Sequence, residues 1–161
     1  MTDKYLLKFQ LELEHSQRLI PGTLQLIKNG SVQNVYRASS SLPGKQVDGS
    51  WKYRGGLIPP TEGNYLPRPG ELYAVALLPV TVNLPGVSDG GKCHFYPISP
   101  SQVNVDGTAR GDWGIHFDGN VPGSLGCIVC ETMLGWKAFE RDIAKIRGLG
   151  VDSIDLDVIY S

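Results

Sequence analysis

Apolar and polar residues alternate at both ends of the chain, which is the pattern of a β-strand with one buried face. Near the start, the apolar positions are Leu7, Phe9, Leu11 and Leu13. Near the end, the apolar or aromatic positions are Ile154, Leu156, Val158 and Tyr160. We therefore expect a strand at each end of the chain, each with its apolar side turned toward the core.

A turn signal separates two further strand-like segments. Residues 23–28 and 32–37 lie on either side of Asn29-Gly30. Both residues of this pair tolerate positive φ, which a type I′ turn requires at its two central positions. The pattern predicts a β-hairpin here.

The middle of the chain has weaker patterns. Residues 39–70 are rich in Ser, Gly and Pro and keep no period, which predicts an irregular surface loop with short strands around Lys52 and Tyr65. The apolar run of residues 71–82 predicts a buried strand that ends near Leu78, because Pro79 interrupts it. Residues 85–100 are again expected to form a loop, and residues 114–117 a short strand.

One helix is predicted, close to the C-terminus. Apolar residues recur there at helical spacing, at Trp136, Phe139, Ile143 and Ile146. Thr132 is a candidate N-cap and Gly148 a candidate left-handed stop. The predicted fold class is mainly β, a β-sandwich or barrel-like domain with one amphipathic helix, and residues 1–161 are expected to form a single domain.

Composition narrows the range of partners. The 161 residues contain 15 basic and 16 acidic side chains, so the formal net charge is -1 and no overall field attracts nucleic acid. No apolar stretch is long enough to span a bilayer, so no membrane insertion is expected. Residues 1–5 lead into a strand without the apolar run of a cleavable signal peptide, and we therefore expect synthesis in the cytoplasm.

Reactive side chains and special backbone positions gather in residues 114–130. A histidine, His116, and a cysteine, Cys127, flank a glycine-rich loop. A thiol is a useful nucleophile only as the thiolate, and a neighbouring imidazole commonly takes its proton. Cys127 is therefore the candidate nucleophile and His116 the candidate base. Backbone amides around Gly126 and Cys127 are candidates to bind the oxyanion of an acyl intermediate.

The segment Ser124-Leu125-Gly126-Cys127-Ile128 resembles the catalytic motif of the L,D-transpeptidase (YkuD-like) family, which carries a histidine, a glycine-containing loop and then Ser-x-Gly-Cys. Residues 56–65 are similar to the segment of that family in which a Pro, a Gly and an aromatic residue begin a strand. The resemblance implies a Cys127 thioacyl-enzyme formed with peptidoglycan stem peptides, without a cofactor. It also implies that the backbone carbonyl of Phe117, or else Asp118, orients the ring of His116.

Two departures from the family leave the reaction open. The interval between His116 and Cys127 is shorter than usual, and Val129 stands where many members have an arginine. Transfer of the stem peptide to an amine and hydrolysis by water are therefore both open. The compact loop looks like the versions found in phage lysins and wall-targeting effectors. Together with the lack of a leader, this implies delivery by a phage particle, a holin or a secretion system, and action at the cell wall.

Other interpretations of these residues stay open. Cys127 and Cys130 have the spacing of a redox pair, and with Cys93, His94 and His116 they form a set of zinc-ligand types. The alternative to an enzyme is a non-catalytic virion or cell-wall-binding protein that keeps the fold.

Several neighbouring residues have supporting roles in this hypothesis. Ser124 is expected to fix the loop through local hydrogen bonds and to lie beside the substrate. Trp113, Asp118 and Tyr96 are candidates to contact the substrate, although the two aromatic residues are equally suited to the core. Cys93 and Cys130 are expected to be small buried residues, and Arg110-Gly111-Asp112 to form a turn.

Overall fold

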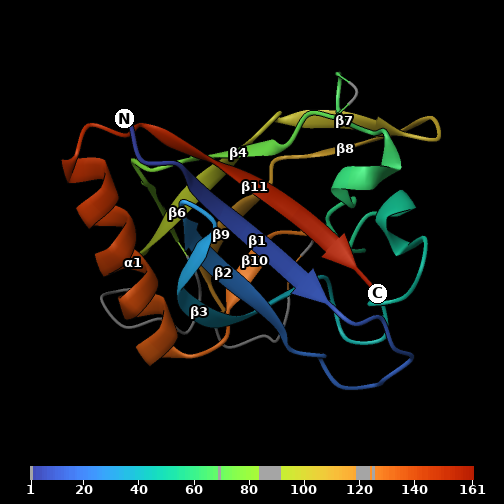
Figure 1. Cartoon of the computed structure of the whole chain (residues 1–161). Coiled ribbons are helices and arrows are strands. Elements are labelled where there is room, and N and C mark those ends of the chain that lie inside the picture. Colours follow the sequence, from blue (N-terminus) through green and yellow to red (C-terminus); the bar gives the residue numbers. More distant parts are fainter. Residues whose placement is uncertain (1, 69, 84–91, 119–123, 125) are drawn as a thin grey trace.

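A computed structural model of the chain describes residues 2–68, 70–83, 92–118, 124 and 126–161 (Figure 1). Within these residues there are strands, one α-helix and two short 3-10 helices. In chain order they are β1 Tyr5–Leu11, β2 Gly22–Lys28, β3 Ser31–Ser40, η1 Ser50–Lys52, η2 Thr61–Gly63, β4 Tyr73–Ala76, β5 Val80–Asn83, β6 Lys92–Ser99, β7 Gln102–Val105, β8 Thr108–Gly111, β9 Gly114–Phe117, β10 Ile128–Cys130, α1 Met133–Gly148 and β11 Ser153–Tyr160.

The main sheet closes into a barrel. Its hydrogen-bonded order is β4-β11-β1-β2-β3-β10-β9-β6, and β6 pairs in turn with β4, while β5 extends from β6. Strands β7 and β8 form a separate hairpin. Helix α1 lies to one side of the strands, next to β3, β9 and β10 in the packing (Figure 1). The predicted fold class, mainly β with one helix near the C-terminus, is confirmed.

The two ends of the chain pair with each other. Strands β1 and β11 run parallel, with Leu7 opposite Leu156 and Phe9 opposite Val158, and all four side chains are fully buried. Burying a side chain of this size contributes roughly 1.5–3 kcal/mol. The alternation that predicted a strand at each end therefore also specifies the face that each strand turns to the core.

The predicted hairpin is present. Strands β2 and β3 are antiparallel, and the turn residues Asn29 and Gly30 have φ values of 50° and 82°. Positive φ at both central positions is the signature of the type I′ turn.

Helix α1 begins and packs as its sequence predicts. The side chain of Thr132 accepts a hydrogen bond from the Gly135 N–H, and the four apolar positions of the helix are buried. Its end differs from the expectation, because Gly148 is still helical and the positive φ, 91°, is at Gly150. No helix in the part of the chain that the structure describes is long and apolar enough to cross a bilayer.

The prediction of an irregular surface loop at residues 39–70 was partly wrong. The expected short strands around Lys52 and Tyr65 are absent, and the described part of this segment carries η1 and η2 instead. The segment is also not purely superficial, since Leu57 and Ile58 are fully buried. These two residues belong to the core cluster beneath the barrel strands, which a count of Ser, Gly and Pro does not reveal.

The predicted elements differ most from the structure in residues 71–111. The strand predicted to end near Leu78 is β4, which ends at Ala76, but the second strand that follows Pro79, β5, was not predicted. Of the loop predicted over residues 85–100, residues 85–91 lie outside the described residues. Residues 92–99 form strand β6, in which the apolar residues Phe95 and Pro97 occupy half-buried positions on either side of buried Tyr96. The hairpin β7–β8 was missed, although Asp106-Gly107 between the strands has φ values of 49° and 89°, as in other tight hairpin turns.

Candidate active site

Adjacent parallel strands carry the two candidate catalytic residues. In the register of β9 and β10, Ile128 lies opposite Ile115 and Val129 opposite His116. Ile115 and Ile128 belong to the core cluster, whereas Val129 is buried outside it. Because side chains alternate along a strand, His116 and Val129 lie on the face opposite the core. Cys127 directly precedes β10, at the end of the strand pair where β9 begins.

The ring of His116 is held by its own chain and by an aromatic neighbour. Its Nδ1 lies 2.8 Å from the backbone carbonyl oxygen of Phe117, and the ring of Phe95 stacks on it at 5.9 Å between centroids. A carbonyl oxygen only accepts, so Nδ1 carries the hydrogen in this bond and Nε2 of the neutral ring keeps its lone pair. Burial lowers the pKa of His116 below its usual value, which favours this neutral form at pH 7. The expected Phe117 contact is thus present, while its catalytic role stays a prediction.

The thiol of Cys127 is half-buried and faces backbone groups. Its Sγ lies 4.0 Å from the carbonyl oxygen of Asp112. Burial raises the pKa of Cys127 and the Asp112 charge adds to the increase, while a hydrogen bond from the Gly114 N–H acts in the opposite direction. The resting group is therefore a neutral thiol at pH 7.

No hydrogen bond joins Sγ of Cys127 to the ring of His116 among the residues that the structure describes. Catalytic hydrogen bonds are often long or poorly aligned before substrate binds. The arrangement is therefore a neutral pair on neighbouring segments rather than a preformed thiolate–imidazolium pair.

Gly126 occupies a position that only glycine fits. Its φ is 108°, which L side chains rarely adopt, and a Cβ placed there would lie 2.6 Å from Nε1 of Trp113 and 2.7 Å from Nη2 of Arg110. Its carbonyl oxygen accepts a hydrogen bond from Oγ of Ser40, at 3.0 Å. The backbone before Cys127 is therefore fixed from both sides. The predicted role of the Gly126 and Cys127 amides toward an oxyanion stays a prediction.

Ser124 connects the backbone of Cys127 to the residue that follows β3. Its Oγ donates to the carbonyl oxygen of Cys127 at 2.6 Å and accepts from the N–H of Ser41 at 3.3 Å. Its own N–H donates to the carbonyl oxygen of Ser41 at 2.8 Å. These local hydrogen bonds match the fixing role expected from the sequence. Residues 119–123 and 125, which complete the predicted glycine loop, lie outside the described residues.

Two of the predicted substrate contacts lie in the core instead. Trp113 and Tyr96 are each 1% exposed, so neither side chain is presented to solvent. The hydroxyl of Tyr96 donates to Glu140 on α1, at 2.7 Å. Asp118 is half-buried, and its backbone N–H donates to the carbonyl oxygen of Cys130 at 2.9 Å. Proximity in sequence to the motif suggested substrate contact for this aromatic pair, with core packing as the open alternative, and core packing is what the structure shows.

The remaining cysteines belong to the hydrophobic core. Cys93 and Cys130 are free and buried, and Cys130 belongs to the core cluster. Burial raises the pKa of Cys130 to about 12. Cys130 is the last residue of strand β10. No group of three or more His, Cys, Asp and Glu side chains within the described residues is placed to hold a metal ion.

One buried charge next to Gly126 was not predicted from the sequence. Arg110, expected in a turn, is on β8 and only 5% exposed. Its guanidinium donates to backbone carbonyl oxygens of Trp51, Gly56 and Leu57 and lies 5.5 Å from the ring of Trp113. The Asp106-Gly107 turn signal predicts the strand, but no pattern in the sequence indicates burial of the guanidinium.

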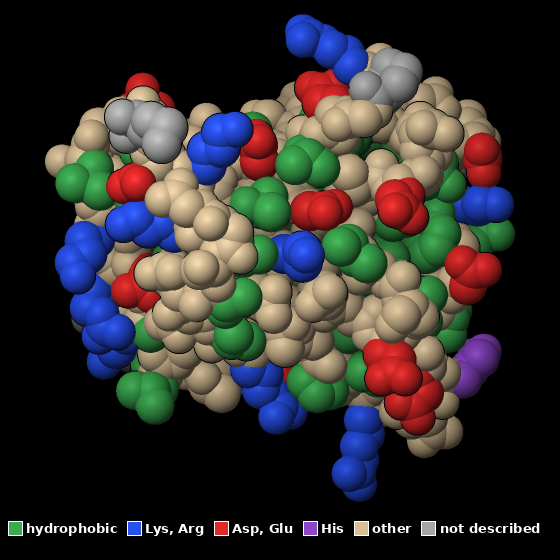
Figure 2. All heavy atoms as spheres, in the orientation of Figure 1, with side chains coloured by type: hydrophobic (Ala, Val, Ile, Leu, Met, Phe, Trp, Pro, Cys, Tyr) green, Lys and Arg blue, Asp and Glu red, His purple; other side chains and the backbone are tan. Residues whose placement is uncertain are grey.

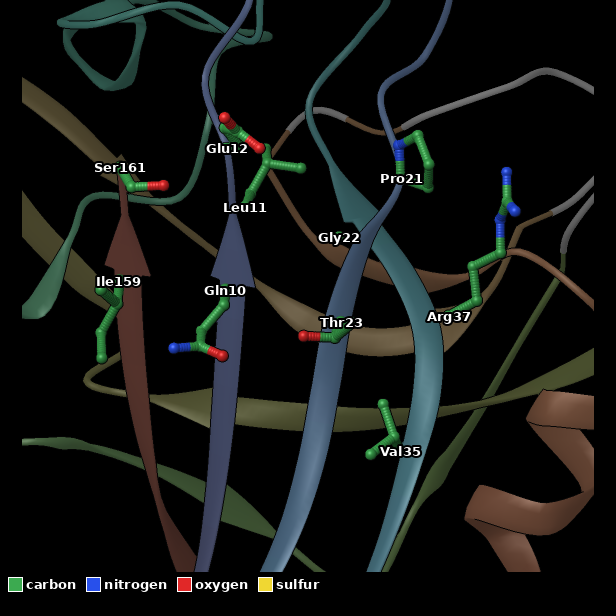
Figure 3. Close-up of a pocket in the computed structure, with 10 residues that line it drawn as sticks. All are labelled: Gln10, Leu11, Glu12, Pro21, Gly22, Thr23, Val35, Arg37, Ile159 and Ser161. Carbon is green, nitrogen blue, oxygen red and sulfur yellow. The ribbon is translucent and has the colours of Figure 1, made fainter. Parts of the chain in front are cut away.

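The surface offers shallow hollows elsewhere. The one drawn in Figure 3 has a volume of about 680 Å³ and lies on the outer face of β11, β1, β2 and β3, where Gln10, Thr23 and Arg37 line it. Neither Cys127 nor His116 is among its lining residues. On the face shown in Figure 2, basic and acidic side chains are mixed, in keeping with the formal net charge of -1. The hollow in Figure 3 is therefore separate from the candidate active site.

Comparison with known proteins gives one distant structural similarity. No family model matches the chain, and no curated protein matches it. The structure is similar to the crystal structure of L,D-transpeptidase 1 from Mycobacterium tuberculosis, with a TM-score of 0.41 and 14% sequence identity. The match covers 98% of this chain and 63% of that protein, so this chain spans less than two thirds of its length.

Proposed function

We propose that the chain is a cysteine-dependent enzyme that cleaves or transfers the stem peptides of peptidoglycan, with Cys127 as nucleophile and His116 as base. The observation that supports this most is the hydrogen bond from Nδ1 of His116 to the Phe117 carbonyl, on the strand beside the nucleophile segment. It leaves Nε2 as the basic nitrogen. The choice of peptidoglycan as substrate rests on the motif of residues 124–128.

The proposed reaction begins from the neutral pair. As the substrate binds, Nε2 of His116 takes the thiol proton and Sγ of Cys127 attacks the peptide carbonyl carbon. The resulting oxyanion is stabilised by backbone N–H groups of the Gly126–Cys127 segment. Collapse breaks the C–N bond, the imidazolium returns its proton to the leaving amine, and a thioester remains on Cys127. An amine then completes transfer, or water completes hydrolysis, each giving up a proton to His116 while the thiolate leaves.

The place of action is part of the same proposal. The protein is made in the cytoplasm and reaches the cell wall through a delivery partner, such as a phage particle, a holin or a secretion system. Either a phage lysin or a wall-targeting effector fits this description.

A second candidate function is binding to the cell wall without catalysis. It is favoured by the lack of a hydrogen bond between Sγ of Cys127 and the His116 ring in the described part of the chain, and by the raised pKa of the thiol. This candidate predicts retention of the protein on wall material without any change in that material.

Digestion of purified peptidoglycan separates the two candidates. Walls of several chemistries are incubated with the wild-type protein, with Cys127→Ala and with Cys130→Ala, and the soluble fragments are analysed by mass spectrometry. We expect the same new fragments from the wild type and from Cys130→Ala, a matched loss of one buried thiol, and none from Cys127→Ala. Identical profiles for the wild type and Cys127→Ala on every wall would exclude the enzyme. An added acceptor amine gives exchanged products if transfer occurs and shortened stems alone if hydrolysis occurs.

A further inference from the structure

The guanidinium of Arg110 joins segments that are far apart in the sequence. Its Nη1 donates to the carbonyl oxygens of Trp51 and Leu57, and its Nη2 donates to that of Gly56. A planar guanidinium offers several donors in a fixed arrangement, so one side chain can hold several carbonyls at once. Arg110 therefore fixes the 51–57 segment to strand β8.

The same guanidinium lies against the backbone that precedes the nucleophile. A Cβ on Gly126 would be only 2.7 Å from Nη2 of Arg110, and 2.6 Å from Nε1 of Trp113. The Trp113 Nε1 atom is buried and has no hydrogen-bond partner among the described residues, and the Arg110 guanidinium lies 5.5 Å from the centroid of the Trp113 ring. The Arg110 guanidinium and the Trp113 ring together form a surface on which Gly126 rests, and we call it the Arg110–Trp113 support.

A second connection links the same two regions. Oγ of Ser40 donates to the Gly126 carbonyl oxygen at 3.0 Å and accepts from the N–H of Ile58 at 3.3 Å. The residues before Cys127 are thus held against the 56–58 segment through Ser40, while that segment is held by Arg110. Displacing the guanidinium would remove the direct contact beneath Gly126 and loosen the 56–58 segment that Ser40 contacts.

We infer that Arg110 is a positioning residue for the nucleophile: with Trp113 it fixes the Gly126–Cys127 backbone and keeps the thiol half-buried beside the Gly114 N–H. The consequence for catalysis rests on the proposed function, whereas the consequence for the thiol does not. A lysine at position 110 keeps the charge but has one point of attachment, so it cannot replace the planar contact under Gly126.

The test compares Arg110→Lys with Arg147→Lys. Arg147 is a matched control because its guanidinium also donates to a backbone carbonyl oxygen, that of Leu77, at 2.7 Å. Iodoacetamide alkylation of each cysteine is followed by peptide mass spectrometry across a pH series, below the unfolding temperature of each variant. The buried thiols of Cys93 and Cys130 report any general loosening.

Two opposite changes are expected for Arg110→Lys. Release of the Gly126–Cys127 backbone exposes the thiol, so alkylation of Cys127 at neutral pH becomes about tenfold faster. The pH midpoint of that alkylation moves down toward the ordinary pKa of a cysteine. The misplaced nucleophile lowers kcat on peptidoglycan fragments about tenfold or more, with KM within about twofold. Cys93, Cys130 and the Arg147→Lys control keep wild-type alkylation rates.

The inference is overturned if Cys127 in Arg110→Lys keeps its wild-type alkylation rate and pH midpoint, or if all three cysteines accelerate together in a folded protein. If Arg110→Lys does not fold, Trp113→Phe replaces it, since the smaller ring withdraws the other half of the support; an unchanged Cys127 midpoint in that variant is then decisive against the inference. A wild-type protein with no activity on peptidoglycan but with selective acceleration at Cys127 would contradict the proposed function alone.

Discussion

At the scale of single residues, burial sets the protonation of the candidate pair. It raises the pKa of the Cys127 thiol and lowers the pKa of the His116 imidazole, and both changes favour the uncharged forms. The Phe117 carbonyl opposes the change at His116, because it accepts a hydrogen bond from Nδ1. In the free protein the pair is therefore a neutral thiol and a neutral imidazole. The proposed mechanism requires substrate binding to bring Sγ of Cys127 and Nε2 of His116 together.

This state predicts two separate pH dependences. The base must be unprotonated, so kcat/KM falls as the pH drops through the pKa of His116, which lies below the ordinary 6.5. Alkylation of Cys127 in the free protein needs the thiolate, so its rate rises through a pKa above the ordinary 9.0. Pre-steady-state alkylation with iodoacetamide measures the second value. An alkylation rate that is already maximal at neutral pH would indicate a preformed ion pair and contradict the neutral one.

A single methyl group at position 126 tests the geometry before the nucleophile. Gly126→Ala imposes a strained φ, which costs about 1–2 kcal/mol, and an overlap with Trp113 and Arg110 that costs a further ~1–3 kcal/mol. Gly30→Ala is the matched control, because Gly30 also has positive φ, 82°, but its Cβ would meet nothing within 4 Å. Urea unfolding should show a clearly larger loss for Gly126→Ala. Equal losses of unfolding free energy for the two variants would mean that the Arg110–Trp113 support accommodates a methyl group at position 126 without measurable destabilisation.

At the scale of elements, the short strand β10 depends on the helix that comes after it. β10 spans Ile128–Cys130 and pairs with β3 on one side and β9 on the other. Helix α1 begins three residues later, capped by Thr132, and its apolar face packs on the core. A slip of one residue in β10 would exchange its core-facing and outward-facing positions, so the anchoring of α1 helps to hold Cys127 in register.

The anchor of α1 is tested by a pair of substitutions on the helix. Phe139 is fully buried and its ring contacts those of Tyr36, Tyr96 and Trp136, whereas Leu134 is 84% exposed. Phe139→Ala should lower the free energy of unfolding by about 3–5 kcal/mol. Leu134→Ala, on the same helix, should change it by less than about 0.5 kcal/mol. Chemical denaturation measures both, and similar small losses would show that α1 is not fixed through this aromatic cluster.

At the scale of the whole molecule, regular local patterns predicted the fold well. The alternation at Leu7 and Leu156, the Asn29-Gly30 turn and the spacing of Phe139 each indicated an element that the structure contains. Strand β6 was not predicted because Phe95 and Pro97 are apolar residues at half-buried positions, so apolar and polar residues do not alternate along its sequence. Closure of the barrel through the β4–β6 pairing joins residues that are distant in sequence, and no local pattern encodes it.

The candidate site was predictable only in part, for the same reason. The sequence motif correctly placed His116 and Cys127 on neighbouring segments, because the parallel strands β9 and β10 that carry or follow them are close in sequence. The support under Gly126 comes from Arg110 and Trp113, whose contacts depend on how β8 and the 51–57 segment meet in space. For Trp113 the sequence left substrate contact and core packing equally open, and only the structure shows that its side chain is buried, at 1% exposure.

The proposed function depends above all on a thioester between Cys127 and a peptidoglycan stem peptide. Intact-protein mass spectrometry detects this intermediate: the protein is mixed with purified stem-peptide fragments, stopped in acid within the first turnover, weighed and then digested to locate any adduct. The expected result is a mass gain equal to the peptide minus its leaving group, located on Cys127 and absent from Cys127→Ala. Turnover of the same fragments with no adduct on Cys127, or an equal adduct in Cys127→Ala, would contradict the proposed mechanism.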